Sequence, residues 1–218
     1  MRFINMNTLK LSVTSIFLCL AVFSAFAQAD RSNNWIARIN YNQNFMTMGY
    51  SDDKWNWPIG GLSIDFGGKQ FFNPGNGWFI EESVEGFFSD LPNSKRTLDG
   101  KWAREAGIGT VLMGGYDFII DKDLSLDVFG GIVYRYILYD KVKHKLADGI
   151  STIHGTHLQP NNLRLKLGAG LNYGKYNFSF SLSPDLINRF RNDWIEGSRG
   201  PTYHYTTLQV ALGFGIYF

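Results

Sequence analysis

The strictest alternation of apolar and polar positions lies at the carboxyl end of the chain. One set of alternate residues is Leu208, Val210, Leu212, Phe214, Ile216 and Phe218. The other set is Thr207, Gln209, Ala211, Gly213, Gly215 and Tyr217. Successive side chains of an extended strand point to opposite faces, so this period of two predicts a strand with one apolar face.

The same alternation recurs upstream and predicts seven further strands. In each of them an apolar set interleaves with a set rich in Asn, Ser, Gly and charged residues. The predicted strands cover residues 35–47, 59–68, 77–88, 102–117, 124–139, 162–173, 176–186 and 204–218. Eight strands of this kind predict an all-β fold, a single antiparallel up-and-down barrel.

The connections between these strands are long and short in turn. The long ones cover residues 48–58, 89–101, 140–161 and 187–203, and they are rich in Gly, Asn, Asp, Lys and Pro. The short ones are residues 69–76, residues 118–123 and the Gly174-Lys175 hairpin. Short turns on one side and long loops on the other are typical of transmembrane barrels, with the long loops outside the cell.

The composition of the polar faces indicates which face meets lipid. These faces are mostly Gly, Ser and Asn with few Lys, which suits a narrow lumen better than a water-facing surface. We interpret their charged residues as a paired network that plugs the lumen, because an unpaired buried charge is too costly. The alternative is a proton or ion path. The residues are Arg38, Asp65, Glu81, Glu85, Glu105, Asp127, Arg135, Arg164 and Lys166.

The third predicted strand departs from the alternation. Glu81 and Glu82 are adjacent, so a regular pleat sends one of them to lipid. A β-bulge that turns both inward is the interpretation we adopt. The alternative is a lipid-facing carboxylate that marks a protein contact or a catalytic site.

The amino terminus predicts export. Arg2 and Lys10 precede an apolar stretch that ends in Ala25-Phe26-Ala27, so we expect residues 1–27 to be a cleaved signal peptide and residues 28–218 to be the barrel domain. Without Arg2 and Lys10, the 21 basic residues of the chain fall to 19, which equals its 19 acidic residues. This balance argues against nucleic acid as a partner. The single Cys lies in the signal segment, so no disulfide is expected.

The four histidines are the remaining candidates for site chemistry. His144, His154, His157 and His204 all fall in or beside the last two long loops. Two His three residues apart, without a Cys or a close carboxylate pair, do not make up a metal site, and we predict no metal and no cofactor. A hydrolase that uses Ser151 or Ser198 would lack the G-x-S-x-G elbow.

The terminal strand, which ends at Phe218, resembles the sorting signal of bacterial outer-membrane β-barrels, and the whole mature chain resembles the small eight-stranded members of that class. The resemblance implies residence in the bacterial outer membrane, with outer-membrane lipid and the barrel-assembly machinery as partners. It also implies an assembly signal in Leu212, Phe214, Ile216 and Phe218.

A second resemblance concerns an enzyme family. The segment Trp35-Ile36-Ala37-Arg38, followed by Pro58 and Gly60-Gly61, resembles the first hairpin of the lipid A palmitoyltransferase barrel. In that family a catalytic His stands where this chain has Ile36, and Ser89-Asp90 could take the place of its Ser and Asp. Without the His there is no general base, so enzymatic activity stays undecided and the balance is against it.

These observations predict an outer-membrane barrel with a side-chain-plugged lumen. Its extracellular loops would act in surface binding, adhesion or envelope integrity, through an extracellular ligand that the sequence does not name. The runner-up is a lipid-modifying outer-membrane enzyme, similar to a lipid A acyltransferase or deacylase. The third reading is a secreted, soluble ligand-binding barrel.

Overall fold

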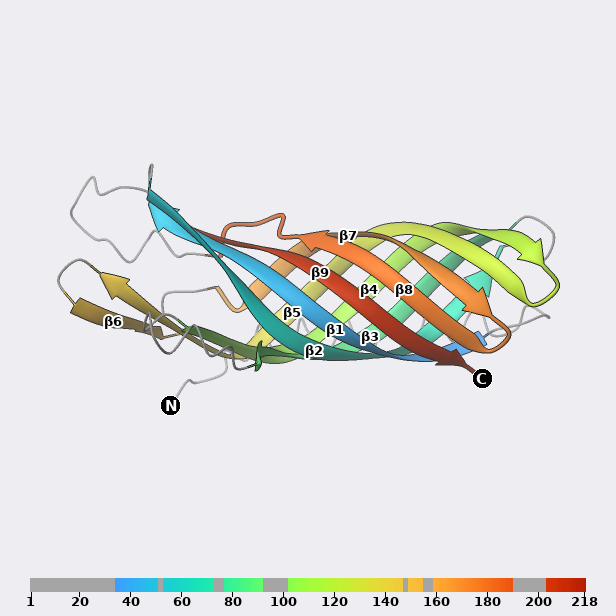
Figure 1. Ribbon diagram of the computed structural model, residues 1–218, viewed down its shortest axis with the longest axis horizontal. Coiled ribbons are helices and arrows are strands. Elements are labelled where there is room, and N and C mark those ends of the chain that lie inside the picture. Colours follow the sequence, from blue (N-terminus) through green and yellow to red (C-terminus); the bar gives the residue numbers. More distant parts are fainter. Residues whose placement is uncertain are drawn as a thin grey trace.

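The computed structural model describes residues 34–50, 53–72, 77–91, 102–146, 149–154, 159–189 and 203–218 (Figure 1). Its strands are β1 Asn34–Tyr50, β2 Asp53–Phe71, β3 Trp78–Leu91, β4 Trp102–Asp121, β5 Leu124–Leu146, β6 Gly149–His154, β7 Asn161–Tyr173, β8 Tyr176–Pro184 and β9 Tyr203–Tyr217. In the described part of the chain, no helix is long and apolar enough to cross a membrane. The predicted signal peptide, residues 1–27, lies outside the described residues.

Eight of these strands close into a barrel. The order around the sheet is β4-β3-β2-β1-β9-β8-β7-β5, and a further pairing between β4 and β5 closes the circle. All of the pairings are antiparallel. The two ends of the described chain meet, since the Trp35 and Phe218 backbones donate to each other at 3.2 and 3.0 Å. The prediction of an all-β, eight-stranded antiparallel barrel is confirmed.

The two ends of the barrel differ. At one end, here called the turn end, β4 joins β5 and β7 joins β8 through tight turns, and Phe218 lies there. Gly174 has a φ of +55° in the second turn, a conformation that favours glycine. At the opposite end, here called the loop end, two hairpins continue beyond the barrel wall (Figure 1).

These hairpins correct two of the predicted loops. β1 and β2 stay paired as far as Tyr50 and Asp53, so most of residues 48–58 is strand. Pro58 is tolerated because, among the described strands, β2 pairs with β1 alone at that position; pairing with β3 begins at Gly60. β5 likewise continues to Leu146 and pairs with β6 inside the expected loop 140–161. Residues 92–101 and 190–202, the central parts of the other long loops, lie outside the described residues.

The alternation of the strands separates an apolar exterior from a polar interior. Leu212 is 60% exposed, whereas Arg164 is 2% exposed. Large exposed apolar side chains cover the outside of every barrel strand. Burying charges while exposing Leu, Ile and Phe is stable only when lipid surrounds the barrel. The prediction of a transmembrane barrel is therefore confirmed, and the soluble barrel with an apolar interior is wrong.

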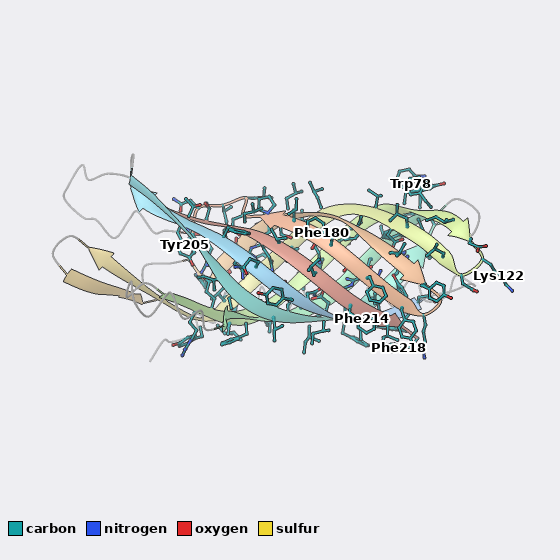
Figure 2. All side chains as sticks on the ribbon, viewed as in Figure 1. Trp78, Lys122, Phe180, Tyr205, Phe214 and Phe218 are labelled. Carbon is teal, nitrogen blue, oxygen red and sulfur yellow. The ribbon has the colours of Figure 1, made fainter. Side chains whose placement is uncertain are left out.

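Aromatic rings gather around the turn end. Trp35 stacks on Phe66 at 5.4 Å between centroids, and Trp78 meets the edge of Tyr116 at 5.1 Å. Phe218 lies 6.0 Å from Phe66 on the same side of the wall. Figure 2 shows Trp78 and Phe218 toward this end and Tyr205 toward the other. Such a girdle marks the membrane interface, where aromatic rings prefer to lie.

The expected β-bulge at Glu81 and Glu82 is wrong. β3 pairs with both β2 and β4 without a register shift at these residues, and the irregularity between β2 and β3 lies at Gly60 and Gly61 instead. The pleat therefore continues regularly. It places Glu81 inside the barrel, 2% exposed, and its neighbour Glu82 on the outer face.

Candidate functional site

The lumen is the best-defined polar site of the described chain. The structure places all nine charged residues singled out from the sequence on the inner face of the barrel wall, and eight of them are buried. Lys166 is half-buried. Strands that lie far apart in the sequence bring these side chains within reach of one another across the lumen.

A first cluster fills the half of the lumen nearer the turn end. The Arg38 guanidinium donates to both carboxylate oxygens of Glu81, at 2.9 and 3.3 Å, and its Nε donates to Asn177 Oδ1 at 3.2 Å. Asp65 Oδ2 lies 3.8 Å from Arg38 Nη1 and 4.0 Å from Lys166 Nζ. Asn40 also donates to this Asp65 oxygen, at 3.0 Å. The cluster is a network in which each carboxylate has a cation.

A second cluster centres on Arg135. Its guanidinium donates to both oxygens of Glu85 in the two-bond arrangement that arginine and carboxylate favour, and it lies 4.4 Å from the centroid of the Phe87 ring. A cavity beside it, also lined by Asn42 and Lys166, has a volume of only about 10 Å³. That space holds about one water molecule, so the side chains fill the lumen at this level.

Sequence reasoning missed Lys69, which the prediction left in a connection. Its Nζ lies 2.6 Å from Asp127 Oδ1 and 4.0 Å from the centroid of the Phe79 ring. Lys69 continues the inward set of Asp65 and Gly67, because β2 runs to Phe71 rather than ending at Gly68. The period of two was therefore the signal that could have found this residue.

The segment that follows β8 closes the loop end. Arg189, which is 0% exposed, donates to Glu105 Oε1 at 2.5 Å, and the Tyr205 hydroxyl donates to the same oxygen at 2.9 Å. Arg189 lies beyond the strands. Burial lowers its pKa, but the nearby Glu105 carboxylate raises it, and the net effect is a pKa above the ordinary value. Arg189 therefore stays charged and holds the segment in the mouth of the barrel.

Asp185 anchors the beginning of this segment. Its Oδ1 lies 2.6 Å from Arg164 Nε, and its Oδ2 accepts from the Thr207 backbone N–H at 2.8 Å. Asp185 continues the alternation of the serines in β8, so its inward position had a sequence signal. Arg189 had none, because it lies outside any alternating stretch.

Positive and negative charges balance inside the barrel. The ion pairs of the described residues join six carboxylates to six cations.

Glycines provide the space for these long side chains. A Cβ at Gly213 would lie 2.4 Å from both Asn40 Oδ1 and Ser179 Oγ. The interior is thus neutral as well as filled.

The turn end is more open. A cavity of about 340 Å³ is lined by Lys69, Phe71, Asp117, Tyr217 and Lys175, among others. The Asp117 Oδ1 and Tyr217 hydroxyl atoms are buried and have no hydrogen-bond partner in the described part of the chain. A polar cavity of this size has room for several water molecules, so we regard it as a vestibule of the lumen.

The two positions weighed for an acyltransferase-like site, Ile36 and Ser89, do not come together. Ile36 pairs with Gly67 and Tyr217 at the turn end, whereas Ser89 pairs with Gly61 toward the loop end and accepts from Asn44 Nδ2 at 3.2 Å. His144 and Ser151 are partners in the register of the β5–β6 hairpin. His157 and Ser198 lie outside the described residues. In the described residues, no group of three or more His, Cys, Asp or Glu residues could hold a metal ion.

Fold and lumen together define a class. A closed barrel with an apolar exterior, an aromatic girdle and a charged interior is the architecture of bacterial outer-membrane proteins, and this chain is a transmembrane barrel of that type, located in the bacterial outer membrane.

No protein-family model and no curated protein matches the chain. Among solved structures it is similar to Ail, the attachment invasion locus protein of Yersinia pestis, at 13% identity, 86% of this chain, 100% of that chain and a TM-score of 0.45. It is also similar to Neisserial surface protein A, at 11% identity over 84% of this chain and 97% of that chain, with a TM-score of 0.46. A third similar structure is that of the outer membrane enzyme PagL, at 9% identity over 81% of this chain and 98% of that chain, with a TM-score of 0.45.

Proposed function

We propose that this chain is a sealed outer-membrane barrel that acts at its loop end in surface binding, adhesion or envelope integrity. The observation that carries the proposal is the filled lumen. Seven ion pairs join its described residues, the cavity at its middle holds about one water, and the Arg189–Glu105 pair lies in its mouth. An eight-stranded barrel filled in this way offers no path for a solute, so activity must lie outside the lumen.

The hairpins that project from the barrel wall support the loop end as the working surface. The β5–β6 hairpin pairs six residues of β6 with β5 beyond the end of β7 (Figure 1). Lysine occupies the alternate positions 141, 143 and 145 of this hairpin. An anionic extracellular ligand is the class of partner that such a sequence would suit.

The proposal also includes the partners of the barrel itself. Outer-membrane lipid surrounds the apolar exterior. The barrel-assembly machinery inserts the chain and reads the terminal strand, in which Leu212, Phe214, Ile216 and Phe218 form the assembly signal. Three of these, Leu212, Phe214 and Ile216, lie on the lipid face of β9.

Truncation of the projecting hairpin tests the working surface. Residues 141–154 are replaced by a two-residue Asn-Gly turn, which joins the end of β5 to the segment before β7. The control replaces the two-residue turn Lys122-Asp123 at the other end by the same Asn-Gly pair. Bacteria that display each variant are then tested for retention on immobilised heparin and on cultured epithelial cells. We expect the hairpin variant to fold and lose retention and the control to retain it. Equal retention by both would contradict the proposal.

A further inference from the structure

Glu82 is a carboxylate on the lipid face of the barrel. It lies on β3 between Ile80 and Val84 and pairs with Gly68 on β2 and Leu112 on β4. Its Oε2 atom is shielded from solvent and has no hydrogen-bond partner in the described part of the chain. It lies four positions along β3 from Trp78 in the girdle, so it stands roughly 10 Å inside the apolar band.

Such a residue requires a partner. Lipid tails offer no donor, and ionisable side chains within a membrane are costly unless they pair with one another or with other polar groups. The residues whose side-chain exposure is described provide no cation on the outer face at this depth. Where side-chain exposure is described, the exposed cations are Arg104 at the loop end and Lys122 and Lys175 at the turn end.

Two glycines lie on the same outer face as Glu82, Gly86 four residues along β3 and Gly114 opposite Ile80 on β4. Gly86 and Gly114 are exposed on the lipid face; a Cβ at Gly86 would meet nothing within 4 Å, and one at Gly114 only the Phe79 carbonyl at 3.8 Å. Packing inside the barrel therefore does not require glycine at either position. Glycine weakens a strand, and its use here is typical of a place where another backbone approaches. The opposite wall presents Phe180 on β8, which Figure 2 labels, and Leu212 on β9 is 60% exposed.

A second copy of the chain fits this wall. Two copies inserted in the same direction are related by a two-fold axis along the membrane normal, which brings each residue near the axis to its own equivalent at the same depth. Any other partner would have to place a polar group at that depth independently. Two facing carboxyl groups that are both protonated can each donate to the other, so the contact needs no cation.

We propose that the β3–β4 wall around Glu82, Gly86 and Gly114 is the contact between two copies of this chain in the membrane. The two Glu82 carboxyl groups hydrogen-bond to each other across the two-fold axis, and the glycines let the two walls approach. The dimer leaves both loop ends free on the same side of the membrane. It would double the number of binding surfaces, but it does not depend on what they bind.

Cysteine crosslinking in intact outer membranes tests the contact. Gly86→Cys and, on the opposite wall, the control Leu212→Cys are each introduced into a Cys19→Ser background, and a short bismaleimide is added. We expect a crosslinked band of twice the monomer mass from Gly86→Cys alone. No band, equal bands from both variants, or a Gly86→Cys band of another mass would overturn the proposal, since the last would show that a different protein covers the wall.

Substitution of Glu82 tests the role of the carboxyl group. Glu82→Leu should lower the crosslinked fraction about tenfold, the size of effect that one polar contact between transmembrane segments provides. Glu82→Gln should keep most of it, because paired amides can also donate to each other. Both variants should fold as well as the parent, because the Glu82 Oε2 atom has no hydrogen-bond partner in the described part of the barrel. Unchanged crosslinking by Glu82→Leu, or its failure to fold, would contradict this account.

Discussion

Removal of one member of the Arg135–Glu85 pair provides the sharpest test of the lumen. Arg135 is 4% exposed, and its guanidinium donates to both oxygens of Glu85 while it lies over the Phe87 ring. Arg135→Leu leaves the Glu85 carboxylate, also 4% exposed, without this partner in a low-dielectric interior. The cavity beside the pair admits only about one water, so solvent cannot replace the guanidinium.

The expected loss is large. Breaking a buried ion pair by removal of one partner costs about 3–5 kcal/mol, most of it the desolvation of the charge that remains. For a domain of this size, such a loss corresponds to a fall in Tm of about 6–20 °C. Lys122→Ala removes a cation from an exposed turn and should change the Tm by less than about 2 °C.

The assay is the heat-modified shift in gel mobility, measured in detergent over a temperature series. The double variant Arg135→Leu with Glu85→Leu separates charge from shape, because it removes both charges and leaves none uncompensated. We expect it to be more stable than either single variant. An Arg135→Leu protein that melts like the parent, or a double variant that loses the sum of both single effects, would refute the reasoning.

Three further predictions concern conduction, assembly and packing. The purified protein in planar bilayers should give no steady current, because side chains fill the lumen; a large and stable single-channel current would contradict the seal. Deletion of Phe218 should reduce the amount of protein in the outer membrane while synthesis and export continue, as fractionation would measure, and normal levels would show that the terminal residue has no part in assembly. Gly213→Val should lower the Tm of the folded, heat-modifiable form, because its Cβ would lie 2.4 Å from the side-chain oxygens of Asn40 and Ser179 and displace them, whereas Ala169→Val on the outer side should melt like the parent.

The fold could be predicted from the sequence because a barrel repeats one simple rule. Lipid on one side and a polar lumen on the other impose a period of two on every strand, so Arg164 and Lys166 could be placed on the inner face from their own strand alone. The prediction at Glu82 failed because we departed from this rule and preferred a bulge to a polar residue on the lipid face. The pleat continues there, and nothing in the strand alone reveals that the carboxylate is tolerated.

Contacts between distant strands could not be predicted. The pairing of Arg135 with Glu85 rather than with Asp127 depends on how the strands stagger around the barrel, which no single strand encodes. Arg189 was also missed, because a segment without alternation gives no signal that it folds back into the mouth. The hairpin extensions were missed for another reason: Pro58 and the Gly and Asp residues of the connections are typical of loops, yet a strand outside the barrel tolerates them.

The measurement that tests the central claim most directly is the accessibility of nitroxide labels placed one at a time at positions 177 to 183 of β8, in a Cys19→Ser background reconstituted in bilayers. Oxygen, which partitions into lipid, should relax labels at positions 178, 180 and 182 strongly. Labels at positions 177, 179, 181 and 183 should be protected from oxygen and from a water-soluble nickel complex alike, because the lumen is filled. The opposite phase, or strong access of the nickel complex to the odd positions, would contradict the sealed barrel.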